Sequence, residues 1–276
     1  MKLPQEEKEH CLGKSSEAPR YFKASKALGQ NYLHDKNLIR KITEAANIES
    51  TDTVLEIGPG PGALTEFLLL SPAQKIIIVE KDKQFIEYWN KRAEGIPKLQ
   101  VIHADALKIK LKDVSLSPIK IISNLPYNVG TALLLRWFDE LALIHSMTLM
   151  FQKEVVLRML ANPGTKDYGR LSILTQWICQ GERLFDVPPT AFRPQPKVVS
   201  SVIQLFPRKA PLFPARKESL EKITATAFQQ RRKTLKKSLH TLFSDPVSIL
   251  ESLYIDPMQR AETLTIEQFC TLAQKL

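Results

Sequence analysis

Hydrophobic and polar positions follow one spacing near the N-terminus and another after residue 53. In residues 35–46, Leu38, Ile39 and Ile42 recur at helical intervals, which predicts an amphipathic helix. Short, continuous apolar runs follow, and polar segments long enough for helices separate them. The runs occupy residues 54–57, 76–79, 101–102, 119–122 and 147–151, and the helices between them are predicted at 61–70, 82–94 and 130–142. Continuous apolar strands that alternate with helices predict a parallel sheet covered by helices on both faces.

The C-terminal part of the chain has a different pattern. Residues 198–206 form one more apolar run, which follows a proline-rich turn and is predicted to close the sheet. Pro207, Pro211 and Pro214 then mark a linker. Beyond the linker only helical spacing remains, at residues 216–230, 231–243, 246–254 and 265–275. We therefore predict a flexible N-terminal tail over residues 1–20, an α/β domain over 21–206 and a small all-helical domain over 207–276.

Positive charge is concentrated in the predicted helical domain. The 276-residue chain carries 39 Lys and Arg against 29 Asp and Glu, a formal net charge of +10. Residues 207–240 contain ten of the cations and two of the acids, so 10 − 2 = +8 of this charge lies there. Such a concentration is typical of a surface that binds a polyanion, since each neutralised phosphate releases a counterion. The candidate anion-binding side chains are Arg231, Arg232, Lys233, Lys236 and Lys237.

Apolar residues in the same segment leave a second interpretation open. Phe228, Leu235 and Leu239, at spacings of seven and four, predict one buried helical stripe opposite the cations. An ordinary solvated helix face would show the same stripe.

Several classes of protein are excluded by composition. No apolar run reaches the ~18–20 residues that a membrane span requires. Cys11, Cys179 and Cys270 are odd in number, far apart and without a C-x-x-C pair, so neither a disulfide framework nor a zinc site is predicted. The N-terminus contains several glutamates and lacks both an apolar signal core and the acid-poor character of a transit peptide. We expect a cytoplasmic monomer without a metal ion.

A glycine-rich turn follows the first predicted strand. Gly58, Gly60 and Gly62 lie between this strand and a helix, where open α/β sheets bind ligands. Their spacing is neither that of a dinucleotide site nor that of a phosphate-binding loop. Pro59 and Pro61 lack backbone N–H groups, so the turn is poorly suited to pyrophosphate. A nucleoside cofactor without phosphates fits it better.

Carboxylates follow at the ends of the next two predicted strands. Glu80 lies 22 residues after Gly58, where a carboxylate can accept hydrogen bonds from both hydroxyls of a ribose. Asp105 follows the third strand, where it can accept from an adenine amine. Taken singly, the glycines can serve a tight turn, and either carboxylate can cap a helix. In this order, the three features predict a pocket for S-adenosylmethionine.

The fourth predicted strand ends in Asn124, Leu125, Pro126 and Tyr127. The exocyclic amine of adenine is a poor nucleophile, because its lone pair is delocalised into the ring. The side-chain carbonyl of Asn124 and the backbone carbonyl of Leu125 can accept the two amine hydrogens and steer the lone pair toward a methyl donor. Pro126 fixes the turn, and Tyr127 can stack on the base. An ordinary Asn-Pro turn is the alternative for an isolated match.

Residues 124–127 resemble the signature of amino methyltransferases that act on nucleic acids. The wider set of matching segments is 29–33 (GQNYL), 56–60 (EIGPG), 124–128 (NLPYN), 151–154 (FQKE), 168–172 (YGRLS), 191–198 (AFRPQPKV) and 230–235 (QRRKTL). This set resembles the small-subunit ribosomal RNA adenine dimethyltransferases, from about residue 21 into the C-terminal segment. Tyr32 stands where Phe is commoner in that family, and His103-Ala104 replaces a more usual glycine before Asp105.

The resemblance implies a Rossmann-like methyltransferase sheet and a role for each matching residue. Gln30, Asn31 and Leu33 would line the methionine end of the cofactor, and Gly58 and Gly60 would approach its body. Glu80 would hold the ribose and Asp105 the adenine amine, while Asn124 would lie between the cofactor and the target base. Phe192 would join Tyr127 in sandwiching a flipped adenine, although a core aromatic is an equal alternative for Phe192. The cations of residues 231–237 would bind RNA.

We therefore hypothesise an enzyme that dimethylates the amines of two adjacent adenosines in a hairpin loop near the 3′ end of 16S rRNA, in the immature small ribosomal subunit. The nearest alternative is an erythromycin-resistance type dimethyltransferase, which modifies a 23S rRNA adenine by the same chemistry. A non-catalytic RNA-binding assembly factor is a further alternative. A small-molecule methyltransferase would have little use for the basic segment.

Overall fold

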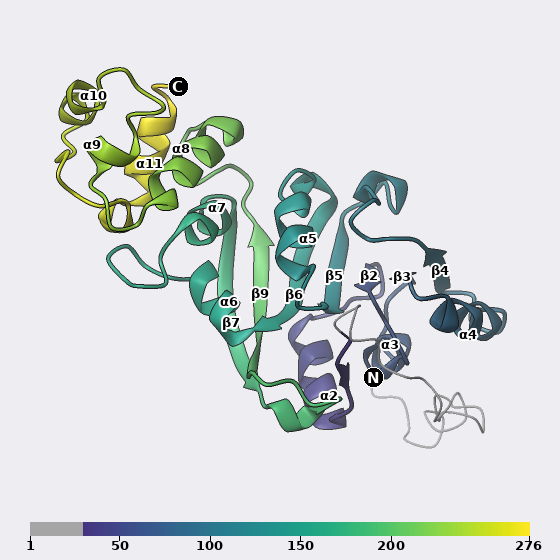
Figure 1. The fold of residues 1–276 in the computed structure, drawn as a ribbon. Coiled ribbons are helices and arrows are strands. Elements are labelled where there is room, and N and C mark those ends of the chain that lie inside the picture. Colours follow the sequence, from purple (N-terminus) through teal and green to yellow (C-terminus); the bar gives the residue numbers. More distant parts are fainter. Residues whose placement is uncertain (1–29) are drawn as a thin grey trace.

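Seven strands form the main sheet of the protein, which a computed structural model describes over residues 30–276 (Figure 1). The tail predicted over residues 1–20 lies outside this described part. Five neighbouring strands run parallel, namely β4 (Leu99–His103), β3 (Lys75–Glu80), β2 (Thr53–Ile57), β5 (Ile119–Asn124) and β6 (Ile144–Gln152). The antiparallel strand β9 (Ser200–Pro207) continues the sheet, and β7 (Cys179–Val187) forms its edge.

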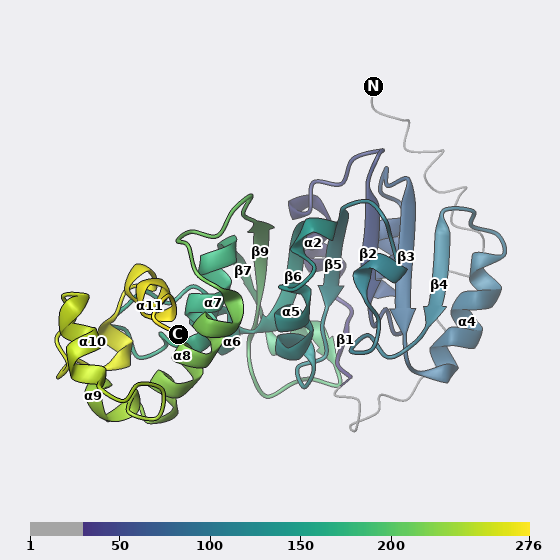
Figure 2. The ribbon, with the colours of Figure 1, turned by 90° about the horizontal axis from the view of Figure 1, so that it is seen from above.

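Side chains of the buried strands alternate between two apolar clusters. In β2, Val54 belongs to one cluster and Leu55 to the other. The cluster of Val54 also contains residues of α2 (Lys36–Ala45), α3 (Ala63–Leu69) and α4 (Lys83–Ala93). The cluster of Leu55 contains residues of α5 (Gly130–Trp137), α6 (Lys153–Met159) and α7 (Arg170–Ile178). Helices thus cover both faces of the sheet (Figure 2), and the predicted α/β fold class is confirmed.

The order of the strands determines where a ligand can bind. β3 and β5 lie on opposite sides of β2, so the chain reverses its direction across the sheet between them. Open α/β sheets bind ligands at the carboxyl ends of the strands at such a reversal. A separate two-stranded sheet pairs β1 (Tyr32–Leu33) with β8 (Phe192–Arg193). This pairing holds the segment before α2 against the segment between β7 and β9.

The spacing predicts no element over residues 153–187, where the structure has α6, α7 and β7. Helix α7 lacks a polar face, because seven of its nine residues are buried. Strand β7 lies at the sheet edge, and most of its residues are half-buried or exposed. Neither an apolar run nor a regular alternation therefore marks these elements in the sequence.

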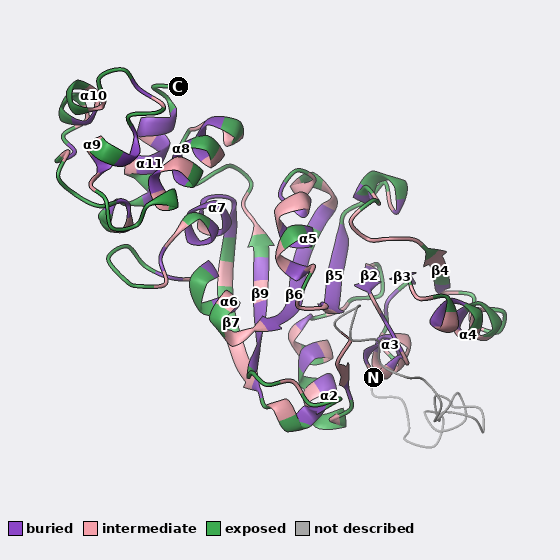
Figure 3. Ribbon diagram, in the orientation of Figure 1, coloured by how far each residue is buried: buried purple, intermediate pink, exposed green. Residues whose placement is uncertain are grey.

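Four helices follow β9 and lie beyond the β7 edge of the sheet in both Figure 1 and Figure 2. They are α8 (Lys217–Gln229), α9 (Leu235–Ser238), α10 (Pro246–Ser252) and α11 (Ile266–Ala273). Their apolar side chains belong to the cluster that also covers the α5 face of the sheet. Figure 3 shows these helices with buried inner sides and exposed connecting loops. Within residues 30–276, no helix is long and apolar enough to cross a membrane.

The single helix predicted over residues 231–243 is wrong. Helix α8 ends at Gln229, and α9 starts only at Leu235. The Arg231 guanidinium ties the segment in between to another part of the chain, because it donates to the carbonyls of Lys166 and Tyr168 at 2.8 and 3.1 Å. At the start of α9, tertiary bonds take the place of helical ones. The Leu235 N–H donates to the carbonyl of Gln259 at 2.8 Å. Leu235 and Leu239 are nevertheless buried as predicted, and Phe228 is half-buried.

Candidate active site

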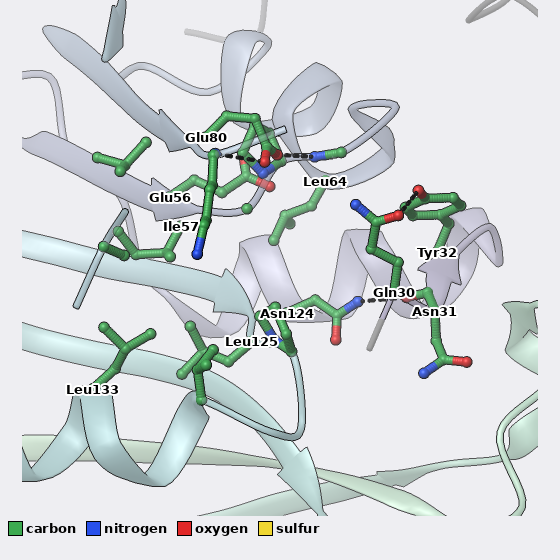
Figure 4. A pocket seen from close by; sticks show the side chains of 18 of the residues that line it. Gln30, Asn31, Tyr32, Glu56, Ile57, Leu64, Glu80, Asn124, Leu125 and Leu133 are labelled. Carbon is green, nitrogen blue, oxygen red and sulfur yellow. Dashed lines mark hydrogen bonds between the residues drawn. The ribbon is translucent and has the colours of Figure 1, made fainter. Parts of the chain in front are cut away.

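A cavity of about 240 Å³ opens where β2, β3 and β5 end, at the reversal in strand order (Figure 4). Most of the site residues predicted from the sequence line it. They are Gln30, Asn31, Leu33, Gly58, Gly60, Glu80, Asp105, Asn124, Leu125, Pro126 and Tyr127. Segments from the start of the described chain and from four strand ends therefore meet in one place.

The turn after β2 uses backbone conformations that favour glycine. Gly58, Gly60 and Gly62 have φ angles of +66°, +54° and +96°. A Cβ on Gly62 would lie 2.3 Å from the Trp89 ring, and one on Gly60 would lie 3.1 Å from the Tyr32 ring. The indole N–H of Trp89 donates to the Gly60 carbonyl at 2.9 Å. The turn is thus packed between two aromatic side chains, with its backbone exposed to the cavity.

The carboxylate of Glu80 is held by the backbone around it. Its Oε1 accepts from the N–H groups of Lys81 and Asp82 at 2.7 and 2.8 Å, and its Oε2 accepts from the N–H of Gly60 at 3.2 Å. Burial raises the pKa of the carboxyl, whereas these three N–H groups favour the charged form. The bonds fix the orientation of the carboxylate against the glycine turn. Its remaining lone pairs can accept from hydroxyl groups in the cavity.

A second carboxyl group, that of Glu56 in β2, also lines the cavity. Its side chain is only 2% exposed and accepts a hydrogen bond from the Thr65 hydroxyl of α3 at 2.7 Å. Burial raises the pKa of Glu56 to about 8, and the charge of Glu80 contributes to the rise. Glu56 is therefore protonated at neutral pH and has a hydrogen to donate.

Asp105 lies at the rim of the cavity, beyond the end of β4. Its Oδ2 forms an ion pair with the Lys81 ammonium at 2.9 Å, and its Oδ1 accepts from the Leu107 N–H at 3.1 Å. The bond from Lys81 lowers the pKa of Asp105, so the carboxylate is charged. The Lys81 side chain is 60% exposed, so it can move aside for a ligand amine. In residues 30–276, no group of three or more His, Cys, Asp and Glu side chains could hold a metal ion.

The segment before α2 closes another side of the cavity. The Tyr32 hydroxyl donates to Oε1 of Gln30 at 2.7 Å, and Nε2 of Gln30 donates to Oδ2 of Asp82 at 3.2 Å. The Tyr32 ring also packs edge-on against Phe85 of α4. The tyrosine hydroxyl, which a phenylalanine would lack, thus helps to orient Gln30.

Asn124, at the end of β5, is oriented by a backbone group of the same segment. Its Nδ2 donates to the carbonyl of Asn31 at 3.2 Å. Because this bond uses the nitrogen of the amide, Oδ1 is left as the acceptor, and Figure 4 shows that oxygen on the side away from Asn31. The geometry therefore supplies the acceptor that the sequence predicts at this position.

The residues after Asn124 form a tight turn that ends in α5. The Pro126 carbonyl accepts from the N–H groups of Val129 and Gly130. Tyr127 is half-buried at the cavity, and its hydroxyl is 2.5 Å from Oγ of the buried Ser200 in β9. This hydrogen bond fixes the position of the ring, since it joins the turn to the main sheet.

Phe192 does not line the cavity, contrary to the expected sandwich with Tyr127. Its side chain is 2% exposed and belongs to the same apolar cluster as Leu33 and Val187. The pairing of β8 with β1 places Phe192 opposite Leu33. The structure therefore favours the alternative of a core aromatic.

The predicted cations of residues 231–237 fall into two groups. The Arg231 guanidinium binds the carbonyls of Lys166 and Tyr168 and lies 3.6 Å from the Glu262 carboxylate, so it supports the fold. Arg232, Lys233 and Lys237 are exposed, and Lys236 is half-buried. Among the described residues, none of these four side chains has a carboxylate within salt-bridge distance.

Three residues that line or support the cavity have no role that the sequence predicts. Glu56 belongs to the matching segment 56–60, but the burial of its carboxyl group depends on the path of α3. Asp82 binds Gln30, and the only local signal for it is its position as the N-cap of α4. Ser200 contacts Tyr127 because β9 pairs with β6. In the sequence, helix α5 separates β6 from the turn that holds Tyr127.

Residues 21–276 match the family model described as ribosomal RNA adenine dimethylase. A protein of Rhodospirillum rubrum named ribosomal RNA small subunit methyltransferase A is 47% identical over 252 residues, which cover 91% of this chain and 87% of the relative. A protein of the same name from Rhizobium johnstonii is 47% identical over 258 residues, which cover 92% of this chain and 93% of the relative.

Solved structures agree with the sequence relatives. A dimethyladenosine transferase from Plasmodium falciparum is similar with a TM-score of 0.76 and 29% identity, over 88% of this chain and 96% of that protein. A 23S rRNA methyltransferase, ErmE, is similar with a TM-score of 0.66 and 25% identity, over 89% of this chain and 99% of that protein. The family model covers residues 21–276 and the sequence relatives cover more than nine tenths of the chain, and the chain belongs to the ribosomal RNA adenine dimethylase family.

Proposed function

We propose that this protein transfers methyl groups from S-adenosylmethionine to the exocyclic amines of two adjacent adenosines, in a hairpin loop near the 3′ end of the small-subunit rRNA. The observation that carries the proposal is the Asn124 amide, oriented by the Asn31 carbonyl so that its oxygen is the acceptor at the cavity. The small-subunit relatives support the choice of RNA.

The residues of the cavity fit S-adenosylmethionine. The Glu80 carboxylate is preoriented to accept from ribose hydroxyls, and Asp105 lies at the rim, where it can accept from an adenine amine. Gly58 and Gly60 leave the space toward Pro126 and Tyr32, which also line the cavity, free of side chains. Gln30, Asn31 and Leu33 line the side assigned to the methionine group. When bound, the cofactor supplies an electrophilic methyl group attached to a sulfonium.

The end of β5 prepares the amine for attack. Oδ1 of Asn124 and the backbone carbonyl of Leu125 accept its two hydrogens, which turns the nitrogen lone pair toward the cofactor side of the cavity. Pro126 restricts the turn that presents both oxygens. A strong general base is not required, because alkylation makes the amine acidic and a proton then leaves to solvent.

Tyr127 holds the target base. Stacking of a base on an aromatic ring contributes about 1–3 kcal/mol, which offsets part of the cost of unstacking the adenine from the RNA. The hydrogen bond to Ser200 keeps the ring at the mouth of the cavity. Since Phe192 is buried in the core, we assign the stacking to Tyr127 alone.

The rest of the chain binds the substrate. We assign catalysis to residues 21–206 and RNA binding to residues 207–276, where Arg232, Lys233, Lys236 and Lys237 have no carboxylate partners within the described residues. For an enzyme that acts on ribosomal RNA we expect a cytoplasmic location, and we expect a monomer.

The test is transfer of labelled methyl from S-adenosylmethionine to under-methylated small ribosomal subunits, with large subunits and free adenosine in parallel, followed by nucleoside analysis. The proposal requires labelled dimethyladenosine in small-subunit RNA alone. Label in large subunits would favour the erythromycin-resistance type of activity, and no label in any RNA would leave binding without catalysis.

A further inference from the structure

Tyr254, in the loop after α10, is the most exposed large hydrophobic side chain in the described part of the chain, with 96% of its surface open to solvent. Its ring contributes almost nothing to the core of the C-terminal helices.

The backbone at Tyr254 makes a tyrosine unexpected there. Its φ angle is +57°, in the left-handed region, and the Ile255 N–H donates to the Leu250 carbonyl across it. Helices commonly end in this way with glycine, because a side chain is disfavoured in that conformation. A strained residue that gains nothing from packing points to a function outside the fold.

The loop of Tyr254 is joined to the basic segment. The Lys236 N–H donates to the Pro257 carbonyl at 3.1 Å, and the Leu235 N–H donates to the Gln259 carbonyl at 2.8 Å. Residues 254–260 and 232–237 therefore form one surface, although they are separate in sequence. Met258 adds an apolar side chain that is 57% exposed.

This surface, which we call the Tyr254 surface, is positively charged. Its cations are Arg232, Lys233, Lys236, Lys237 and Arg260. Its acid is Asp256, whose carboxylate accepts from the Met258 N–H at 2.8 Å, and Glu251 of α10 adjoins the surface and is counted with it. The balance is 5 − 2 = +3, and within residues 30–276 none of the five cations is paired with a carboxylate.

We propose that Tyr254 adds a base-binding contact to the RNA-binding segment: it stacks on an unpaired base, while the surrounding cations bind the adjoining phosphates. The proposal rests on the function proposed above and extends it to a surface beyond the β7 edge of the sheet, away from the cavity (Figure 1). Exposed aromatic rings among unpaired cations are the combination that binds single-stranded RNA. A protein partner would instead call for a wider apolar patch around the ring.

The experiment compares the full-length variants Tyr254→Gly and Tyr254→Phe with the wild type. Binding to under-methylated small subunits is measured by filter retention, together with the melting temperature and the affinity for S-adenosylmethionine. Leu116→Ala is the matched control, since Leu116 is 90% exposed on the loop before β5, outside this surface.

We expect Tyr254→Gly to bind small subunits and protein-free small-subunit rRNA at least about 5-fold more weakly. Its melting temperature should stay the same or rise, because glycine suits the left-handed backbone. Tyr254→Phe and Leu116→Ala should bind like the wild type. The affinity for S-adenosylmethionine should not change in any variant.

Wild-type affinity in Tyr254→Gly would overturn the proposal. So would an equal loss in Tyr254→Phe, since that would assign the effect to the hydroxyl group. A loss confined to intact subunits, with protein-free rRNA bound normally, would assign the surface to a ribosomal protein. Methyl transfer by the wild-type protein tests the proposed function separately, so a failure of that function is distinguishable from a failure of this surface.

Discussion

Glu56 is a buried carboxyl group whose protonation links stability to pH. Between the ordinary glutamate value of 4.5 and the folded pKa of about 8, the folded protein keeps a proton that the unfolded chain releases. Stability therefore falls as pH rises through this window, by up to about 1.4 kcal/mol per pH unit from this group. Above the folded pKa the loss is complete.

Glu56→Gln should remove this contribution, because the amide stays neutral and its oxygen can still accept from Thr65. We predict that the free energy of unfolding in urea falls less steeply between pH 5 and pH 8 in this variant than in the wild type. The exposed Glu87→Gln of α4 is the control and should follow the wild-type curve. Parallel curves for Glu56→Gln and the wild type would show that Glu56 is ionised in the folded protein.

Single residues were predictable where a strand end fixed their place. Glu80, Asp105 and Asn124 lie at the cavity because parallel strands bring their carboxyl ends to one edge. The orientation of the Asn124 amide was not predictable, since it depends on the carbonyl of Asn31, 93 residues away. The burial of Phe192 was not predictable either. It depends on the pairing of β1 with β8, and strands of two residues are too short to show a pattern in the sequence.

Among the connections between elements, the glycine turn between β2 and α3 is tightly constrained. Gly62→Ala would place a Cβ 2.3 Å from the Trp89 ring at a φ of +96°. We predict a loss of roughly 1–3 kcal/mol in stability and weaker binding of S-adenosylmethionine, because the turn must move to accommodate the methyl group.

Gly95→Ala is the matched control for that variant. A Cβ on Gly95 meets no atom within 4 Å, so stability and cofactor affinity should remain those of the wild type. Thermal unfolding and calorimetric titration measure both quantities. Equal behaviour of the two alanine variants would contradict the packing of the turn against Trp89.

The segment between α8 and α9 contains one cation that supports the fold, Arg231, and two cations that we assign to RNA binding, Arg232 and Lys233. Arg231→Ala should lower stability by about 1–2 kcal/mol, because two backbone carbonyls lose their donor.

The double variant Arg232→Ala/Lys233→Ala should keep its stability and bind RNA more weakly, with a salt slope smaller in magnitude by about 2. An unchanged salt slope in the double variant would show that these cations do not contact phosphates.

Elements with a strong pattern were predicted, and elements made by tertiary contacts were not. The buried strands β2, β3 and β5 appear as apolar runs because both faces of the sheet are covered. Helix α9 is four residues long, and the backbone N–H groups at its start donate to carbonyls of the 257–259 loop. Helical spacing does not contain this information, so the prediction of a helix over residues 231–243 is too long. Helix spacing depends on local sequence, whereas this break depends on residues far along the chain.

In the whole molecule, the candidate active site and the candidate RNA-binding cations lie in two different regions. The cavity lies at the carboxyl ends of the parallel strands (Figure 4). The candidate cations, which have no carboxylate partner within residues 30–276, lie between α8 and α9 and on α9, and Figure 1 shows these helices beyond the β7 edge of the sheet. A small substrate would occupy only the cavity. A large, folded RNA can contact both regions at once.

In the proposed mechanism, the Asn124 amide holds the amine that receives the methyl group. The most direct test is the single-turnover rate of methyl transfer to under-methylated small subunits by Asn124→Ala, compared with Asn90→Ala, which changes an exposed amide on α4. We predict a rate about 100-fold lower or more for Asn124→Ala, with the affinities for cofactor and subunit retained, and a wild-type rate for Asn90→Ala. A rate for Asn124→Ala within a factor of about two of the wild type would contradict the claim.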